Sequence, residues 1–149
     1  MKTLDVNVPD GYEIDIEKSN IVFKKIDDAI IRWNKNYNGV EIKADGEHFV
    51  VDANPSYVMN WYDAVRFYNH PHRSHTWGLP TITQLQVIAK YLDRINDVIR
   101  EKNGFKIIDC LWSCEEVDGF FTWLVYMSDG DTYRGNKYGS YYVRAVSAL

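Results

Sequence analysis

The stretch Trp77-Gly-Leu-Pro-Thr81 and the apolar-periodic run after it constrain the fold more than any other part of this chain. Thr81, followed by Gln84 three residues later, has the pattern of a helix capping box. Asn103-Gly104 supplies the left-handed stop expected at the far end. The pattern predicts one helix over residues 82–100, roughly 30 Å long, as the main helix on which the sheet packs. Its apolar face recurs at steps of three and four: Ile82, Leu85, Ile88, Leu92, Ile95 and Ile99.

The size and charge of the chain limit its architecture and its partners. Its 149 residues suffice for one domain with a core and a small appendage, but not for two full domains. Its formal net charge of −4 comes from interspersed acidic and basic residues without a basic stripe, so no nucleic-acid partner is expected. No apolar run is long enough to span a membrane, and residues 1–10 lack a signal-peptide pattern. The expected location is cytoplasmic or virion-associated, and the sequence does not distinguish the two.

Residues 1–35 are predicted to form an N-terminal hairpin module and a connector. Apolar and polar residues alternate over residues 6–26 in two short runs on either side of a polar turn. An isolated hairpin is marginally stable in water, so we expect it to dock to a second copy or to a larger assembly through an exposed strand edge. Asp27 or Asp28 is expected to cap a short helical segment that runs through Trp33.

Residues 36–149 are predicted to form the main domain. Two alternating runs flank Asp45-Gly46, the strongest short-range hairpin signal in the chain. Asn60 can cap a helix that ends before Pro71, and the main helix follows. Four short strand-like runs after Gly104 predict a β-meander: 105–113, 122–127, 132–133 and 141–146. This order of strands, helices and strands predicts an α+β fold rather than repeated βαβ units.

Several short motifs occur in an order that resembles a known family. They are Asn60-Trp-Tyr-Asp-Ala64, Trp77-Gly-Leu-Pro-Thr81 with Gln84-Leu85, Leu111-Trp-Ser113, Thr122-Trp-Leu-Val125, Ser128-Asp-Gly130 and Tyr142-Val-Arg-Ala-Val146. Together they resemble the C-terminal domain family of bacterial collagen-like adhesins, over roughly residues 46–149. That family is similar in fold to C-type lectins and to formylglycine-generating enzymes. Gly78 departs from it, since the family usually has Arg there. Residues 5–26 resemble a leader module of gut-bacterial prophage and mobile-element proteins.

The resemblance implies a C-type-lectin-like fold for residues 36–149, with two main helices packed on a mixed or antiparallel sheet. In such a fold the first and last strands pair, and a loop region with a small sheet presents a binding surface. Fold alone does not identify a ligand, so function must be argued from the residues at that surface.

The cysteine and histidine residues provide little support for catalysis or metal binding. Cys110 and Cys114 are flanked by acidic residues, which raise a thiol pKa and oppose thiolate chemistry of the formylglycine-generating type. His70, His72 and His75 cluster, but a closed metal site needs further ligands that the sequence does not identify. We therefore expect reduced thiols, solvated imidazoles, no metal and no cofactor.

A calcium-dependent lectin site is also not expected. The triplets Glu-Pro-Asn and Trp-Asn-Asp, which typically present oxygen ligands to calcium in such sites, are absent from the sequence. Five loop carboxylates concentrate negative charge instead, and we interpret them as turn residues: Glu115, Glu116, Asp118, Asp129 and Asp131.

The last third of the chain holds the predicted ligand-binding residues. The sequence has 11 Tyr, and this segment mixes Tyr with Asn, Ser and Gly, as antibody paratopes do. Strand alternation turns either Tyr141 or Tyr142 inward, while Tyr133, Arg134, Asn136 and Tyr138 are predicted to be exposed. The resemblance also places ligand contacts here. The predicted ligand-binding residues are Tyr133, Arg134, Asn136, Lys137, Tyr138 and Tyr141.

These patterns predict a non-enzymatic recognition or attachment module that binds a protein or glycan ligand without calcium. The alternatives are a structural subunit of a phage or mobile-element assembly and a thiol enzyme of the formylglycine-generating type. Trp77, Trp112 and Trp123 are expected to build the core beneath the binding surface. Arg144 lies between apolar residues of the last strand, so it needs a buried hydrogen-bond acceptor if it points inward.

Overall fold

The computed structural model describes residues 7–10, 12–17, 20–25, 28–68 and 76–149. The order of its elements makes the chain an α+β protein, as the sequence predicts. The elements are β1 (Tyr12–Glu17), β2 (Asn20–Lys25), β3 (Ile30–Asn34), β4 (Gly39–Ala44), β5 (Glu47–Asp52), β6 (Tyr57–Met59), α1 (Trp61–Tyr68), β7 (Trp77–Gly78), α2 (Ile82–Lys90), α3 (Leu92–Glu101), β8 (Cys110–Glu116), β9 (Phe121–Tyr126), β10 (Thr132–Asn136), β11 (Tyr141–Val143) and β12 (Val146–Ser147).

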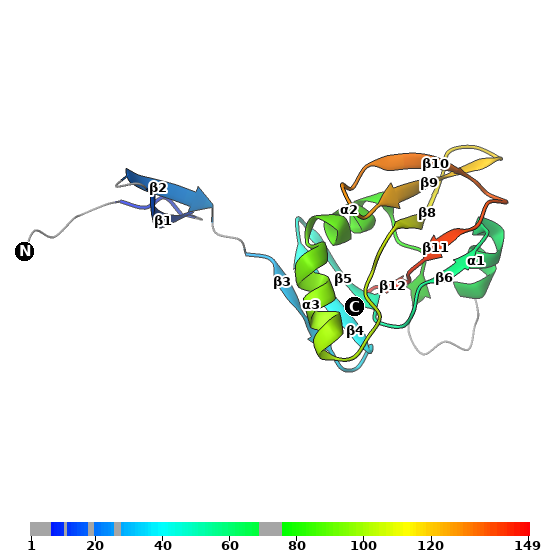
Figure 1. Cartoon of the computed structure of the whole chain (residues 1–149), viewed down its shortest axis with the longest axis horizontal. Helices are drawn as coiled ribbons and strands as arrows, with labels where there is room; N and C mark the ends of the chain where they lie inside the picture. Colours follow the sequence, from blue (N-terminus) through cyan, green and yellow to red (C-terminus); the bar gives the residue numbers. More distant parts are fainter. Residues whose placement is uncertain (1–6, 11, 18–19, 26–27, 69–75) are drawn as a thin grey trace, which may run out of the picture.

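Two five-stranded sheets build the main body (Figure 1). We call them the β4 sheet, with strand order β3-β4-β5-β12-β7, and the β8 sheet, with strand order β10-β9-β8-β11-β6. The larger core cluster includes Ile42 and Phe49 from the β4 sheet, Leu111 and Val125 from the β8 sheet, and Leu85 from α2. The two sheets therefore share one hydrophobic core, to which the helices contribute.

The long helix predicted over residues 82–100 is interrupted at Tyr91. Its predicted start is confirmed, because Thr81 and Gln84 form a complete capping box. Tyr91 has φ of −108° and ψ of 22°, which ends α2, and Figure 1 shows α3 running in a different direction. The prediction of one continuous helix was therefore wrong. Since α2 contacts β8 and β9 while α3 contacts β3 and β4, the break lets each half bury its apolar face against a different sheet.

The predicted helical segment ending at Trp33 is instead the edge strand β3. It pairs antiparallel with β4, and Ile31 and Trp33 pack against the core. On the other side of the strand, Arg32 Nη2 donates to Glu41 Oε2 at 2.9 Å. The helix prediction was wrong because an apolar side chain at every second position finds a partner strand, a tertiary interaction that outweighs local capping. Strand β3 thus belongs to the β4 sheet.

The local turn signals are confirmed. Asp45 and Gly46 have φ of 53° and 81°, as a two-residue turn between β4 and β5 requires. Asn103 has φ of 57° just after α3. Three strands of the predicted meander form it as β8-β9-β10, but the prediction was wrong for the fourth, because β11 pairs parallel with β8 and antiparallel with β6. By contrast, β6 was not predicted, because three residues are too few to show an alternating pattern.

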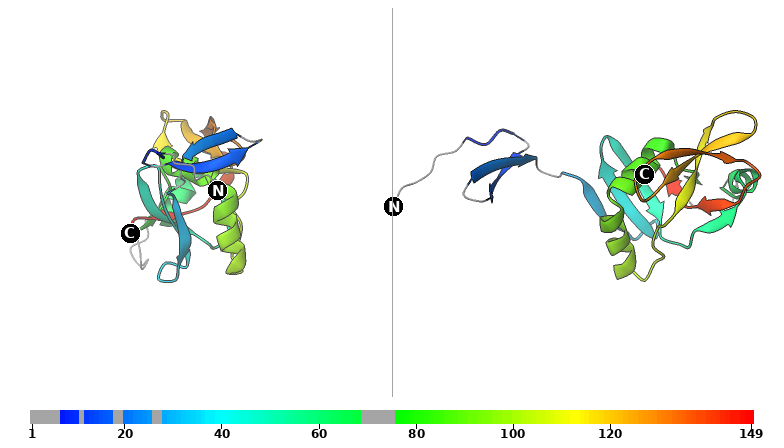
Figure 2. Two further views of the ribbon diagram at one scale, coloured as in Figure 1. Left: turned by 90° about the vertical axis from the view of Figure 1, so that its left-hand side faces the viewer. Right: turned by 45° about the horizontal axis from the view of Figure 1, so that its top comes forward.

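The N-terminal hairpin is confirmed as an antiparallel pair of β1 and β2, with Ile14 opposite Phe23 in register. Figures 1 and 2 show it apart from the two sheets, on the side of β3. Tyr12, Ile14 and Ile21 are each more than 40% exposed. Within the part of the chain that the structure describes, no helix is long and apolar enough to cross a membrane.

Arg144 lies where the chain passes from β11 in the β8 sheet to β12 in the β4 sheet, and it is only 1% exposed. The predicted buried acceptor is confirmed, and there are four of them. Burial lowers the pKa of Arg144 to about 10. The acceptors are Ser56 Oγ at 2.9 Å, Asp52 O at 2.9 Å, Phe105 O at 2.7 Å and Lys106 O at 3.0 Å. The last strand, β12, follows Arg144. It pairs antiparallel with β5, the first strand of residues 46–149, which are the region of the resemblance.

Candidate functional site

The residues predicted to bind a ligand lie in three separate surroundings. Tyr133 packs edge-on against Tyr126, with ring centroids 4.5 Å apart. Its neighbour Arg134 points to the opposite face of β10 and lies over the Trp123 ring, 5.6 Å from its centroid. The predicted exposure of Tyr133, Arg134, Asn136 and Tyr138 is confirmed. Trp123 is therefore half-buried beneath an arginine and does not belong to the central core.

Tyr141 is half-buried rather than displayed. Its ring packs edge-on against Trp112 at 5.0 Å, within the smaller core cluster beneath α1. Tyr142, on the opposite face of β11, packs against the larger core. Trp112 is fully buried and Trp77 is packed against the same smaller cluster, so the predicted core role of these two tryptophans is confirmed.

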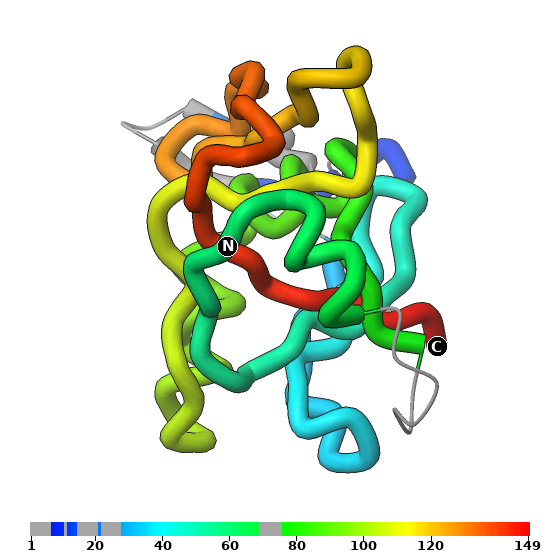
Figure 3. The backbone as a smooth tube through the Cα atoms, turned by 90° about the vertical axis from the view of Figure 1, so that its right-hand side faces the viewer, coloured from blue at the N-terminus to red at the C-terminus, as the bar shows by residue number. Residues whose placement is uncertain are grey.

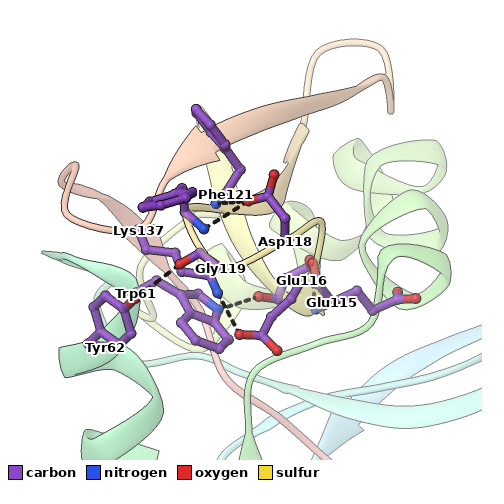
Figure 4. A network of polar contacts seen from close by, with 10 residues as sticks. Trp61, Tyr62, Glu115, Glu116, Asp118, Gly119, Phe121 and Lys137 are labelled. Atoms are coloured by element: carbon purple, nitrogen blue, oxygen red, sulfur yellow. Dashed lines mark hydrogen bonds and ion pairs between the residues drawn. The ribbon is translucent and has the colours of Figure 1, made fainter.

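Lys137 is the buried member of the predicted set, with 3% of its surface exposed. Its Nζ lies 2.6 Å from Glu116 Oε1 and 4.9 Å from the centroid of the Trp61 ring (Figure 4). Its backbone N–H donates to Phe120 O at 2.9 Å, and its carbonyl accepts from Trp61 N at 3.0 Å. Lys137 thus ties the loop after β10 to the β8–β9 loop and to the start of α1. Its position allows it to orient a binding surface, not to face a ligand.

Tyr138 is the most exposed tyrosine described, at 76%. Asn136 Oδ1 accepts from Tyr138 N at 2.9 Å, and Gly139 N donates to Asn136 O at 2.8 Å, which fixes a tight turn. The ring lies 5.2 Å from that of Tyr62, centroid to centroid, at an angle of 50°. The turn and the neighbouring ring therefore hold Tyr138 in one place while leaving most of it open to solvent.

The start of α1 provides the other side of the site. Asn60 Oδ1 accepts from Asp63 N at 2.8 Å, as expected of the predicted helix cap. The Trp61 indole N–H donates to Ser113 O at 3.0 Å, which holds the first turn of α1 to β8. Figure 3 looks onto this end of the molecule, with α1 in front of the C-terminal strands. The first turn of α1 is therefore fixed by both a cap and a cross-link to the β8 sheet.

Two hollows lie side by side along α1. We call the larger one, of about 590 Å³, the α1 hollow. A second hollow of about 260 Å³ shares Trp61 and Val65 with it and also touches Gly78. A Cβ added at Gly78 would meet nothing within 4 Å, so the absence of a side chain there leaves open space. The α1 hollow is lined by Asn60, Trp61, Tyr62, Val65, Arg66 and Tyr138.

The two cations beside the α1 hollow are each paired with a carboxylate. Arg66 Nη2 lies 2.5 Å from Asp63 Oδ1, and Lys137 is paired with Glu116. Asp118 Oδ1 accepts from the backbone N–H groups of Phe120 and Phe121, and these bonds lower the pKa of Asp118. The interpretation of the loop carboxylates as turn residues holds for Asp118. It was wrong for Glu115 and Glu116, which lie in β8 and accept from Ile82 N and Lys137 Nζ.

No metal site is visible in the described ranges, because no three His, Cys, Asp or Glu side chains converge there. His70, His72 and His75 lie outside the described residues. The sequence did not predict four of the site residues, namely Tyr62, Val65, Arg66 and Phe120. The Trp61-Tyr62 pair just after the cap was the available signal, but the helical pattern alone does not show which side of α1 faces the loop after β10.

Cys110 and Cys114 both lie in β8 and are free thiols. Burial raises the pKa of both thiols, and the neighbouring carboxylates of Asp109 and Glu115 raise them further. A thiol whose pKa is raised stays protonated at neutral pH, whereas catalysis by cysteine needs the thiolate.

We expect the thiols of Cys110 and Cys114 to react with iodoacetamide more slowly than free cysteine at pH 7, with the rate rising only at more alkaline pH. Single Cys110→Ala and Cys114→Ala variants separate the two rates in a mass-spectrometric time course. A thiol in the folded protein that reacts faster than free cysteine at pH 7 would contradict this expectation and would support the thiol-enzyme alternative.

No protein-family model matches the sequence, and no curated protein matches it.

Proposed function

We propose that this protein is a non-enzymatic, calcium-independent recognition module that binds a protein or glycan surface through the α1 hollow and the exposed tyrosines near it. The observation that carries this proposal is the display of Tyr138, which is 76% exposed yet held against Tyr62 and fixed by the Asn136 turn. A large amphipathic ring held in one conformation provides contact area at low entropic cost, as in antibody paratopes.

The pre-organisation of the site supports binding rather than packing as its role. The buried Lys137 bonds to the β8–β9 loop and to the start of α1. These bonds fix the loop after β10, which lies below Tyr138. A surface that is already ordered loses less conformational freedom when a ligand binds. Phe120 is 72% exposed on the adjacent loop and provides further apolar contact area.

The N-terminal hairpin is the proposed means of attachment to a second copy or a larger assembly. A two-stranded sheet is marginal on its own, and three apolar residues of this one are exposed: Tyr12, Ile14 and Ile21. Figures 1 and 2 place it on the side of β3, while α1 and the loop after β10 lie at the opposite end. An anchor at one end and a binding surface at the other suit an attachment protein of a phage or mobile element.

The double variant Tyr62→Ala/Tyr138→Ala should lose binding to bacterial surface extracts by at least about tenfold, since it removes two aromatic contacts from the centre of the site. Binding is measured by biolayer interferometry with immobilised protein, with and without calcium, and should not depend on calcium. Tyr57→Ala is the matched control, because Tyr57 is 48% exposed but does not line the α1 hollow. Tyr133→Ala and Arg134→Ala show how far the site extends along β10.

The absence of binding by the wild-type protein to any extract would contradict the recognition proposal. If the protein is instead a structural subunit, the triple variant Tyr133→Ala/Arg134→Ala/Tyr138→Ala should change the sedimentation coefficient of the assembly. Its binding to the extracts should be the same as that of wild type. Binding that requires calcium would contradict the calcium-independent mode.

A further inference from the structure

We propose that the α1 hollow binds an uncharged pyranose ring of a glycan, with the apolar face of the sugar against Tyr138 and its hydroxyl groups near Asn60 and Arg66. This inference rests on the proposed function and names the ligand class of the same site. Four features of the hollow support it: the pairing of its charges, the use of its aromatic faces, the polar groups left at its rim, and its open form.

The charges indicate a neutral ligand. Each cation at the site already has a carboxylate partner: Arg66 has Asp63 and Lys137 has Glu116. A ligand carboxylate or phosphate would therefore compete with an existing ion pair for either cation. A neutral ligand binds without breaking these pairs and without leaving an unpaired charge at the contact.

The aromatic rings disfavour a ligand cation. A cation is attracted to the face of an aromatic ring, within about 6 Å of the centroid. Lys137 Nζ already occupies that position at Trp61, 4.9 Å away, and at Tyr62, 5.9 Å away. A second cation near these rings would be repelled by the first. The weakly polarised C–H groups on one face of a pyranose can lie on the Tyr138 ring without such repulsion.

The rim offers hydrogen-bond groups suited to hydroxyls. Asn60 uses its Oδ1 to cap α1, so its amide NH2 group is left as a donor at the hollow. Arg66 donates to Asp63 through Nη2 and retains further N–H donors. The Tyr138 hydroxyl can both donate and accept. These groups surround aromatic side chains, and the volume of about 590 Å³ has room for a sugar ring.

The open form of the hollow distinguishes a sugar from a peptide anchor. Peptide anchors contribute most in pockets that exclude water around a side chain. The α1 hollow instead lies on the surface beside a tyrosine that is 76% exposed. Hydroxyl-rich ligands bind well in such wet sites, because bridging waters complete their hydrogen bonds.

The test is an array of oligosaccharides that carries neutral hexoses together with sialylated and sulfated glycans. We expect the wild-type protein to bind neutral members, Tyr138→Ala to bind them at least about tenfold more weakly, and Tyr138→Phe to stay within about threefold of wild type because the ring is retained. Near-ultraviolet circular dichroism confirms that both variants are folded. Binding restricted to sialylated or sulfated glycans would overturn the inference.

A second arm separates this inference from the proposed function. Bacterial surface extract is treated with periodate, which cleaves vicinal diols of sugars, or with protease. Binding that is lost after periodate and kept after protease supports the sugar ligand. Binding kept after periodate and lost after protease overturns the sugar ligand while the recognition proposal stands. The absence of binding to untreated extract contradicts both.

Discussion

Replacing Arg144 by Met should lower the free energy of unfolding by about 3–5 kcal/mol, a large effect for a single substitution. Met approximates the apolar stem of Arg but provides no donor. The four oxygen atoms that now accept from the guanidinium would lose their partner at the crossing between the two sheets. Each unsatisfied buried acceptor costs about 1–3 kcal/mol, less where water can reach it.

The position of Arg144 in the fold explains the size of this effect. Its guanidinium joins the end of β5, the segment before β6 and the segment after α3, so a single side chain links three parts of the chain. Arg144→Lys keeps the charge, but an ammonium lacks the planar fork that reaches acceptors in several directions. We therefore expect the Arg144→Lys variant to be more stable than Arg144→Met but much less stable than wild type.

The measurement is urea unfolding followed by circular dichroism. Arg134→Met is the matched control, because Arg134 is exposed on β10 and its loss should cost no more than about 1 kcal/mol. Equal stability of the Arg144→Met and Arg134→Met variants would show that the buried guanidinium does not hold the sheets together.

The parts of the fold that could be predicted from the sequence are those set by neighbouring residues. The Thr81 cap and the turn at Asp45-Gly46 depend on side chains and φ angles within a few positions, and both are present. The need of Arg144 for buried acceptors also followed from its apolar neighbours. Which oxygen atoms accept could not be predicted, because Ser56 lies 88 residues away in the sequence.

The errors share a physical cause. The break at Tyr91 is set by the two sheets against which α2 and α3 pack, and strand β3 is set by its pairing with β4 and its contacts with α3. A continuous 3.6-residue period is compatible with one helix or with two helices at an angle. The sequence shows the apolar face but not the number of surfaces that it covers.

In the candidate site, too, features set by neighbouring residues could be predicted, whereas features set by distant contacts could not. Composition alone placed Tyr138 at the surface, since a turn rich in Asn and Gly leaves its side chains in solvent. The burial of Lys137 could not be inferred, because its carboxylate partner is 21 residues away and its aromatic neighbours come from α1. A lysine in a polar segment is normally exposed, and only the folded structure shows that this one is used internally.

Lys137→Met should lower the free energy of unfolding by about 2–3 kcal/mol and weaken ligand binding by roughly tenfold while Tyr138 itself is unchanged. The substitution removes a charge-assisted hydrogen bond to Glu116 and a cation over the Trp61 ring. Met keeps much of the apolar packing of the lysine stem. The loss of stability that remains is therefore due to the missing charge, which in wild type holds the loop below Tyr138 against α1.

A double-mutant cycle with Glu116→Gln isolates this interaction. Glu116 is about half exposed, since 53% of its side chain is accessible, so water can solvate it when Lys137 is removed. Lys137 is almost fully enclosed and cannot be solvated in the same way, so Glu116→Gln alone should cost about 1–2 kcal/mol. We expect a coupling energy of about 1–2 kcal/mol between the two positions from urea unfolding.

Hydrogen exchange provides the local measurement that links this pair to the site. The amide of Lys137 donates to Phe120 O and that of Trp61 donates to Lys137 O, so both amides should exchange faster in Lys137→Met than in wild type. The amides of β4 and β5, in the other sheet, serve as the internal control. Weakened binding together with unchanged exchange at Trp61 would mean that Lys137 contacts the ligand directly. Faster exchange at Trp61 with unchanged binding would mean that the order of this loop does not contribute to recognition.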